Sequence, residues 1–243
     1  MCDEYFVYNG VCSLDMGIEL QKAIEIKNAT PNVETITVPG KNGALTYWDG
    51  TYQNRVVTAK CFVLNENAAD YLEAISVWLA RTPGYLRLEM SQEPNVFMLA
   101  RVSSMGTTSV RNGVLVPLEI KFDCMPQKFL KSGEQISQVK NGGNVYNAWL
   151  PAKPLIHIRC QGTVSLTMGE STIKLAVGGT KMQDYYIDCE TQNIYDGFGT
   201  SANSKAEVNK FPLFDHGETS VAWTGGLNGT ISKVEITPRW WTL

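Results

Sequence analysis

Turn dipeptides recur along this sequence and constrain its fold more than any other feature. They combine Asn or Asp with Gly, the residues that most readily adopt the positive φ of a tight hairpin. Among them are Asn9-Gly10, Asn42-Gly43, Asp49-Gly50, Asn112-Gly113, Asn141-Gly142 and Asn228-Gly229. The pattern predicts a mostly β protein with antiparallel strands.

The segments between these turns carry alternating apolar and polar residues, or β-branched runs, as strands do. The pattern is clearest over residues 35–38, 84–90, 115–122 and 165–175. The regular alternation of strands and helices that builds a parallel α/β sheet is absent from the sequence. An antiparallel arrangement is therefore favoured.

One segment departs from the period of two. Over residues 65–80 apolar side chains recur at spacings of three and four, which predicts an amphipathic helix laid on a sheet. The apolar stripe comprises Ala68, Tyr71, Leu72, Ile75, Trp78 and Leu79. A second, shorter helix is predicted over residues 16–24, although Gly17 disfavours it.

The composition changes near Met125. Before this residue strands accompany the helix, whereas after it strands follow one another with the turn spacing of a β-sandwich. Pro126 lacks the N–H that a sheet ladder needs and suits an exit into a connector. We predict an N-terminal domain over residues 1–128 and a sandwich domain over residues 129–243, with an exposed loop at 197–210.

The charge balance excludes several partners. The chain has 21 Lys and Arg against 24 Asp and Glu, a formal net charge of −3 at pH 7. Binding to a nucleic-acid backbone requires clustered cations, which this sequence lacks. No apolar run approaches the roughly 20 residues that cross a bilayer, and the first residues do not resemble a signal peptide. We expect a protein that stays in the cytoplasm where it is made and binds neither membranes nor DNA.

Candidate catalytic groups are few. His157 falls in an expected strand and His216 in an expected turn, where a structural role is the simpler interpretation. Asp184, Asp188 and Glu190 lie close in sequence, but on one strand they form a solvated rim as readily as a glycosidase pair. The six cysteines are widely spaced, which indicates buried free thiols. We predict no catalytic residue, no metal and no cofactor.

A carbohydrate-binding module is the main alternative to a structural protein. Trp149, Trp223, Trp240 and Trp241 lie in the second half of the chain, and indole rings stack well on sugars. Such a site also needs polar groups that converge beside the ring, which sequence spacing does not reveal. Trp149 and Trp223 are the candidate contacts for a glycan or a protein partner.

Short motifs in a fixed order carry a family resemblance. In the first half they are FVYNGV and SLD (residues 6–11 and 13–15), VPGKNGAL (38–45), DGTYQNR (49–55), VWL (77–79), YLRL (85–88) and VPLEIKFDCMP (116–126). In the second half they are PLIHI (154–158), YIDCE (186–190), FPL (211–213) and ITPRWWTL (236–243). In order and spacing they resemble the distal tail protein (Dit) family of siphophages, the hub of the tail tip or baseplate, over nearly the whole chain.

The resemblance implies a structural virion protein that is not an enzyme. In the family, six copies form a ring that joins the tail tube to the tail-tip fibre or receptor-binding apparatus. The implied partners are further copies of the chain in a homohexamer, the tail tube protein, a tail-associated hub or fibre protein, and receptor-binding proteins. DNA would pass through the ring without specific binding, and the protein would assemble in the host cytoplasm before it becomes part of the virion.

The resemblance also assigns roles to parts of each domain. The second domain would be a galectin-like sandwich, although His157-Ile158-Arg159 lacks the Asn of a galectin sugar site. In the first domain, a turn followed by strands over residues 46–64 would form an arm that adds to the neighbouring subunit; the alternative is an ordinary hairpin within the domain. The arm residues implied are Pro39, Gly40, Gly43, Asp49, Gly50, Tyr52 and Arg55.

Overall fold

The computed structural model describes residues 4–64, 68–106, 115–178 and 181–243. The chain is mostly β, as the turn dipeptides and the period of two predict, and α1 (Ala68–Ala80) is the one α-helix in the described part. It divides into two compact units, residues 1–128 with Leu243, and residues 129–242.

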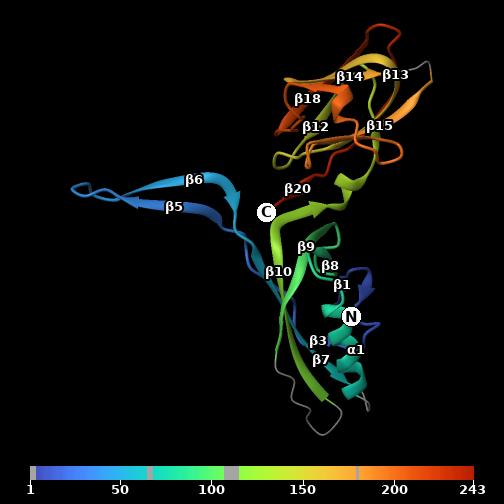
Figure 1. Cartoon of the computed structure of the whole chain (residues 1–243). Helices are drawn as coiled ribbons and strands as arrows, with labels where there is room; N and C mark the ends of the chain where they lie inside the picture. The colour runs from blue at the N-terminus through green and yellow to red at the C-terminus, as the bar shows by residue number, and fades with distance from the viewer. Residues whose placement is uncertain (1–3, 65–67, 107–114, 179–180) are drawn as a thin grey trace. The chain divides into compact units, whose positions relative to one another are not determined.

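The first unit is built on one antiparallel sheet, drawn in blue to green in Figure 1. Its strands follow the spatial order β2-β1-β8-β9-β10-β7-β3, and β4 also pairs with β7. The strands of this unit are β1 (Phe6–Tyr8), β2 (Val11–Cys12), β3 (Ile18–Leu20), β4 (Glu25–Ile26), β5 (Pro31–Thr37), β6 (Ala44–Tyr52), β7 (Arg55–Leu64), β8 (Leu86–Met90), β9 (Val96–Met105) and β10 (Leu115–Leu130), whose last two residues belong to the second unit.

Helix α1 packs its apolar stripe on this sheet, which confirms the predicted helix; residues 65–67, at its predicted start, lie outside the described residues. Ile75 and Leu79 are buried, and the Trp78 ring stacks on Phe6 with centroids 6.0 Å apart. The Trp78 indole N–H also donates to the carbonyl oxygen of Tyr8 at 3.3 Å. Burial of a side chain such as Ile75 contributes about 1.5–3 kcal/mol, so packing stabilises a helix too short to persist alone.

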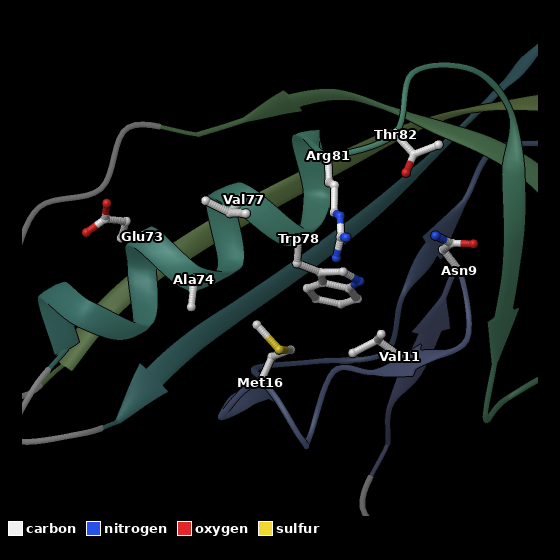
Figure 2. Close-up of a pocket in the computed structure, with 9 residues that line it drawn as sticks. All are labelled: Asn9, Val11, Met16, Glu73, Ala74, Val77, Trp78, Arg81 and Thr82. Carbon is white, nitrogen blue, oxygen red and sulfur yellow. The ribbon is translucent and has the colours of Figure 1, made fainter.

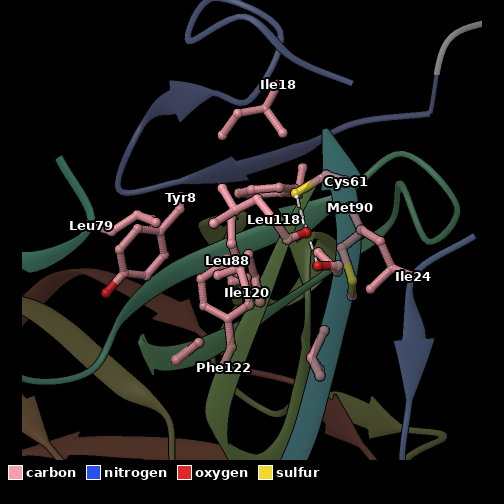
Figure 3. Close-up of a cluster of buried hydrophobic side chains, with 14 of the residues drawn as sticks. Tyr8, Ile18, Ile24, Cys61, Leu79, Leu88, Met90, Leu118, Ile120 and Phe122 are labelled. Atoms are coloured by element: carbon pink, nitrogen blue, oxygen red, sulfur yellow. Dashed lines mark hydrogen bonds between the residues drawn. The ribbon is translucent and has the colours of Figure 1, made fainter. Parts of the chain in front are cut away.

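Alternate residues of the central strands form the core beneath the helix (Figure 3). Leu118, Ile120 and Phe122 of β10 all point into it, as the period of a strand requires. Cys61 lies in the same core, with its sulfur 3.2 Å from the Leu118 carbonyl oxygen, and burial raises the pKa of its thiol to about 12.

The cysteines of the described residues are free, and most are buried, as predicted. Cys61, Cys124, Cys160 and Cys189 are buried, whereas Cys12 is partly exposed. Cys2 lies outside the described residues.

The predicted helix over residues 16–24 is wrong. Gly17 has a φ of 66°, and the chain instead enters strand β3, where Ile18 pairs with Val63 of β7. Ile18 is buried, Glu19 exposed and Leu20 half-buried, so the period of a strand prevails over the i, i+4 spacing of Met16 and Leu20.

The second unit is organised around one long strand, β13 (Leu155–Met168). Its first half pairs with β15 and β19, and its second half with β14 and β18, with a register shift between Arg159 and Cys160. The other strands are β11 (Ser137–Gln138), β12 (Gly143–Asn147), β14 (Ser171–Val177), β15 (Gln183–Asp188), β16 (Asn193–Asp196), β17 (Ala206–Val208), β18 (Gly217–Gly225), β19 (Thr230–Thr237) and β20 (Trp241–Thr242).

Two details of this unit differ from the prediction. The strand expected over residues 165–175 is two strands, because Gly169, at a φ of 55°, turns β13 back into β14. The expected loop at 197–210 is exposed only in part, since it contains a 3₁₀ turn (Asn203–Lys205) and strand β17, and Ala202 is buried.

Candidate oligomerisation interface

The most unusual feature of the first unit is a hairpin that we call the arm, residues 31–52. Strands β5 and β6 pair only with each other within the described residues and leave the sheet as a long ribbon (Figure 1). An isolated two-stranded ribbon is marginally stable in water, so the arm calls for contacts that one chain does not supply.

The two faces of the arm follow from the register of its strands. Glu34 lies opposite Tyr47 and Ile36 opposite Leu45, and we call these four residues the Tyr47 face. On the other side Val33 lies opposite Trp48 and Thr35 opposite Thr46, which form the Trp48 face.

Both faces of the arm expose large apolar side chains. Val33, Ile36, Leu45, Tyr47 and Trp48 are each between 45% and 61% exposed. Clustered exposed apolar side chains mark interaction surfaces in soluble proteins. The arm is therefore the strongest candidate interface of the first unit.

The implied arm residues Pro39, Gly40 and Gly43 lie in the turn that joins β5 to β6. Gly40 and Gly43 have φ values of 80° and 82°, which residues with a Cβ rarely adopt. They shape the tip of the arm, and the space beside each glycine is open.

Asp49 and Gly50 form a bulge in β6. The Asp49 carboxylate accepts hydrogen bonds from the backbone N–H of Thr51 at 2.8 Å and from its hydroxyl at 2.6 Å. These hydrogen bonds lower the pKa of Asp49, and Gly50 supplies the φ of 84° that the bulge requires. A bulge of this kind bends the strand and fixes the direction of the arm.

Of the two remaining implied residues, Tyr52 lies at the root of the arm and Arg55 lies outside it. Tyr52 ends β6 opposite Pro31, half-buried, with its ring 5.6 Å from that of Trp48. Arg55 is not part of the arm: it begins β7, pairs with Cys124 and is only 1% exposed. Burial lowers the pKa of its guanidinium, which donates a hydrogen bond to the Pro126 carbonyl oxygen.

The arm also begins earlier in the sequence than predicted. The hairpin pairs residues 31–37 with 44–52, whereas β7, expected as its continuation, belongs to the main sheet. Residues 31–37 are therefore half of the arm, and the expectation of strands over 46–64 missed them.

A polar cluster fixes the chain where it returns from the arm. The Asn54 amide donates to the carboxylate of Asp123 at 3.0 Å and to the Tyr85 hydroxyl at 2.7 Å. The Tyr85 hydroxyl and the Arg101 guanidinium donate to the same carboxylate at 3.1 and 2.8 Å. Burial alone would raise the pKa of Asp123, but these donors outweigh it and hold the pKa below its ordinary value.

The face of the main sheet opposite to the core is charged and nearly balanced. Its ion pairs are Lys121 with Glu119 at 2.9 Å, Arg101 with Asp123 at 2.8 Å, Arg87 with Glu89 at 2.5 Å, and a longer Lys60–Glu119 contact at 3.9 Å. Each of these cations thus has a carboxylate beside it. We call this surface the paired-charge face.

The two candidate tryptophans of the second unit do not form one site. Trp149 lies just beyond the end of β12 and is 43% exposed, whereas Trp223 lies in β18 and packs partly against the core. Asn147, next to Trp149, pairs with Gly217, six residues along β18 from Trp223, which is about 20 Å of strand. Only Trp149 presents an exposed ring.

Each histidine contacts neighbouring side chains of the second unit. The two ring nitrogens of His157 each lie 2.9 Å from a carboxylate, those of Glu235 and Asp184, and the ring stacks on Tyr186. His216 is exposed and makes an edge contact with the Tyr146 ring.

The two carboxylates of β15 are too far apart to form a glycosidase pair. Asp184 and Asp188 lie four residues apart on β15, about 13 Å of strand, beyond the spacing of a glycosidase pair. Burial alone would raise the pKa of Asp188, but the Arg239 guanidinium, 2.6 Å away, outweighs burial and lowers it. Glu190 lies beyond the strand, 3.5 Å from Lys153.

Within the described ranges, no group of three or more His, Cys, Asp or Glu residues could hold a metal ion. None of the helical residues described forms a helix long and apolar enough to span a membrane.

The exposed apolar side chains of the arm could not be identified as interface residues from the sequence. They resemble the inward residues of ordinary strands, and a run of apolar residues on both strands of one hairpin is the only signal that sequence offers.

Comparison with known proteins concerns the fold as a whole. No family model matches this sequence, and neither does any curated protein. Among solved structures, the chain is similar to the Dit protein (gp 19.1) of SPP1, presented as a paradigm of the hub adsorption apparatus of phages that infect Gram-positive bacteria. The TM-score is 0.75 at 14% sequence identity, and the similarity covers 96% of each chain. The chain therefore has a Dit-like fold.

Proposed function

We propose that this protein is a structural component of a phage tail tip, a ring-forming hub between the tail tube and the fibre or receptor-binding apparatus. The observation that carries the proposal is the similarity to a hub protein over 96% of both chains. A likeness this complete extends over both units and the arm, whereas a shared sandwich alone would match half of the chain. The proposed role requires no catalysis and no cofactor.

The arm supports a ring of identical copies. A closed ring uses two different complementary faces on each subunit, and a protruding hairpin with apolar residues on both sides supplies one of them. In this proposal the ring has six copies, and residues from Pro39 at the tip to Tyr52 at the root reach the neighbouring subunit. Main-chain hydrogen bonds of an added strand then contribute to the contact.

The paired-charge face is the part of the first unit best suited to line a channel for DNA. A channel through which DNA slides must not hold its phosphates. Cations already paired with carboxylates neutralise few phosphates, so they displace few of the counterions condensed on DNA and gain little binding energy. Six copies with a net charge of −3 each carry about −18, which opposes retention of DNA in the ring.

The partners follow from this role. The ring contacts the tail tube protein on one side and a tail-associated hub or fibre protein on the other, and receptor-binding proteins attach around it. The protein assembles in the host cytoplasm and resides at the tail tip of the virion.

The oligomeric state tests this proposal. Light scattering and negative-stain microscopy of the purified chain should give particles of six subunits with a central hole, alone or with the tail tube protein. Monomers at high concentration, with no rings even beside the tube protein, would refute it.

A carbohydrate-binding module remains the second candidate, because the Trp149 ring is exposed beside the Asn147 turn. If it binds cell-wall or receptor glycans, a glycan array should detect the parent protein, and Trp149→Ala should abolish the signal. Trp223→Ala is the matched control, since that ring packs partly on the core. No binding by the parent protein eliminates this candidate.

A further inference from the structure

A groove runs along the outer side of helix α1 and has a volume of about 800 Å³. Ala74 and Val77 of the helix line it, with Trp78 on the same helix and Val11 and Met16 from the segment around β2 (Figure 2). Val77 is 59% exposed, so its side chain is accessible to a partner. The middle of the groove is therefore lined mainly by apolar side chains, with Asn9 and Thr82 near one end, and the groove is open to solvent.

The two ends of the groove carry opposite charges. Glu73 lies at one end and Arg81 at the other, as Figure 2 shows. Eight residues separate them, which is about 12 Å along a helix. Within the described part of the chain, neither side chain has an ion-pair partner.

The Tyr47 face of the arm also has apolar side chains between two charges, a negative one toward its root and a positive one at its tip. Glu34 lies toward the root of the arm, Ile36 and Leu45 follow, and Lys41 lies in the turn at the tip, where its N–H donates to the Val38 carbonyl oxygen. From Glu34 to Val38, where this turn begins, is about 13 Å of strand, and Lys41 lies three residues further on in the turn. Asp49 lies beside Glu34 and Tyr47 and adds a second negative charge at the root end.

We propose that the Tyr47 face of one copy binds in the α1 groove of a second copy, with Glu34 beside Arg81 and Lys41 beside Glu73. The inference rests on the proposed ring and names the surface that receives the arm. Tyr47 is 61% exposed and Val77 59% exposed in the single chain, so the arm does not fill the groove of its own chain. The arm is an apolar ribbon with a charge at each end, and the groove has an apolar middle with a charge of the opposite sign at each matching end. These are the two different complementary faces that a closed ring requires.

Charge reversal tests the pairing. Glu34→Arg and Arg81→Glu should each raise the concentration at which half of the chains assemble by about tenfold, equivalent to about 1.4 kcal/mol per interface. The double variant should restore assembly, because it exchanges the two charges. Glu207→Arg, on an exposed side chain of the second unit, is the matched control and should assemble like the wild type.

A second variant tests the apolar contact. Val77→Asp changes an exposed helix position and leaves the fold intact, yet it places a charge against Ile36 and Leu45 of the incoming arm. It should abolish assembly, while the circular dichroism spectrum and the melting temperature of the monomeric chain stay unchanged.

The outcomes separate this inference from the proposed function. A wild type that never assembles refutes the ring itself. A wild type that forms rings, with Glu34→Arg, Arg81→Glu and Val77→Asp forming them equally well, leaves the ring standing and overturns the groove as the site of the arm. Variants that form rings as readily as the wild type but no longer bind the tail tube protein also overturn the inference, since the groove would then be the binding site for the tail tube protein.

Discussion

Ile75 offers a sharp test of how the first unit is held together. This side chain projects from α1 into the core of the sheet and is 1% exposed. Ile75→Ala removes three carbon groups, worth about 0.8 kcal/mol each, so the transfer loss is about 2.4 kcal/mol. The cavity left behind adds to this loss, and the better helix propensity of Ala offsets about 0.5 kcal/mol, which gives about 3 kcal/mol in total.

Differential scanning calorimetry of the full chain at one fixed concentration measures this loss. For a unit of about 130 residues, 1 kcal/mol lowers the melting temperature by about 4 °C, so the transition of the first unit should fall by about 12 °C. The transition of the second unit should not move, because none of its residues contacts Ile75 in the core cluster.

Val77→Ala is the matched control on the same helix. Val77 is exposed in the single chain, so at a concentration where the chain is monomeric its truncation should change the free energy of unfolding by less than about 0.5 kcal/mol. Two results would refute the account of α1 as a helix held by its buried stripe. One is a fall in melting temperature of less than 3 °C in Ile75→Ala, and the other is a fall in Val77→Ala as large as that in Ile75→Ala.

Three further predictions follow from individual contacts. Asp123→Asn should destabilise the first unit at neutral pH and weaken ring formation. Because the pKa of Asp123 is lowered in the folded state, the extra free energy of unfolding of the wild type should be fully present above the ordinary pKa of Asp, about 3.9. It should disappear as the pH falls through the lower folded-state pKa, which urea titrations at several pH values will measure. In the folded chain iodoacetamide should alkylate Cys12 and spare Cys61, whose thiol is buried and has a pKa of about 12; equal rates of labelling by mass spectrometry would contradict this. Gly162→Ala should prevent the second unit from folding, because the glycine has a φ of 65° and a Cβ would lie 2.2 Å from the Asn228 carbonyl oxygen; a soluble variant with a wild-type melting curve would disprove it.

Local patterns in the sequence predicted much of the fold. The stripe from Tyr71 to Leu79 predicted α1, and alternation predicted β8 and β10, because each pattern reports which side of an element faces a core. The same rule failed over residues 16–24, where apolar residues fit both periods and the positive φ of Gly17 settled the outcome.

The candidate interface was harder to predict. Arg55 was assigned to the arm because the family resemblance placed strands over residues 46–64 in an extended hairpin, but it shares a strand face with Val57 and Ala59 and is buried with them. In the sequence Ile36 and Tyr47 resemble core residues, because β-propensity does not distinguish a strand buried in its own domain from a strand whose apolar side chains are exposed for an interface. The distance between Trp149 and Trp223 likewise depends on strand register, which spacing along the chain does not encode.

The central position of β13 has a consequence for how the second unit opens. Four strands form hydrogen bonds with it, two along each half, so neither half can separate without breaking its ladders. The amide protons of β13 should therefore exchange with solvent only when the whole unit unfolds, while those of the short strand β11 exchange through local fraying. The second unit then behaves as one cooperative block that stays folded until it is lost all at once.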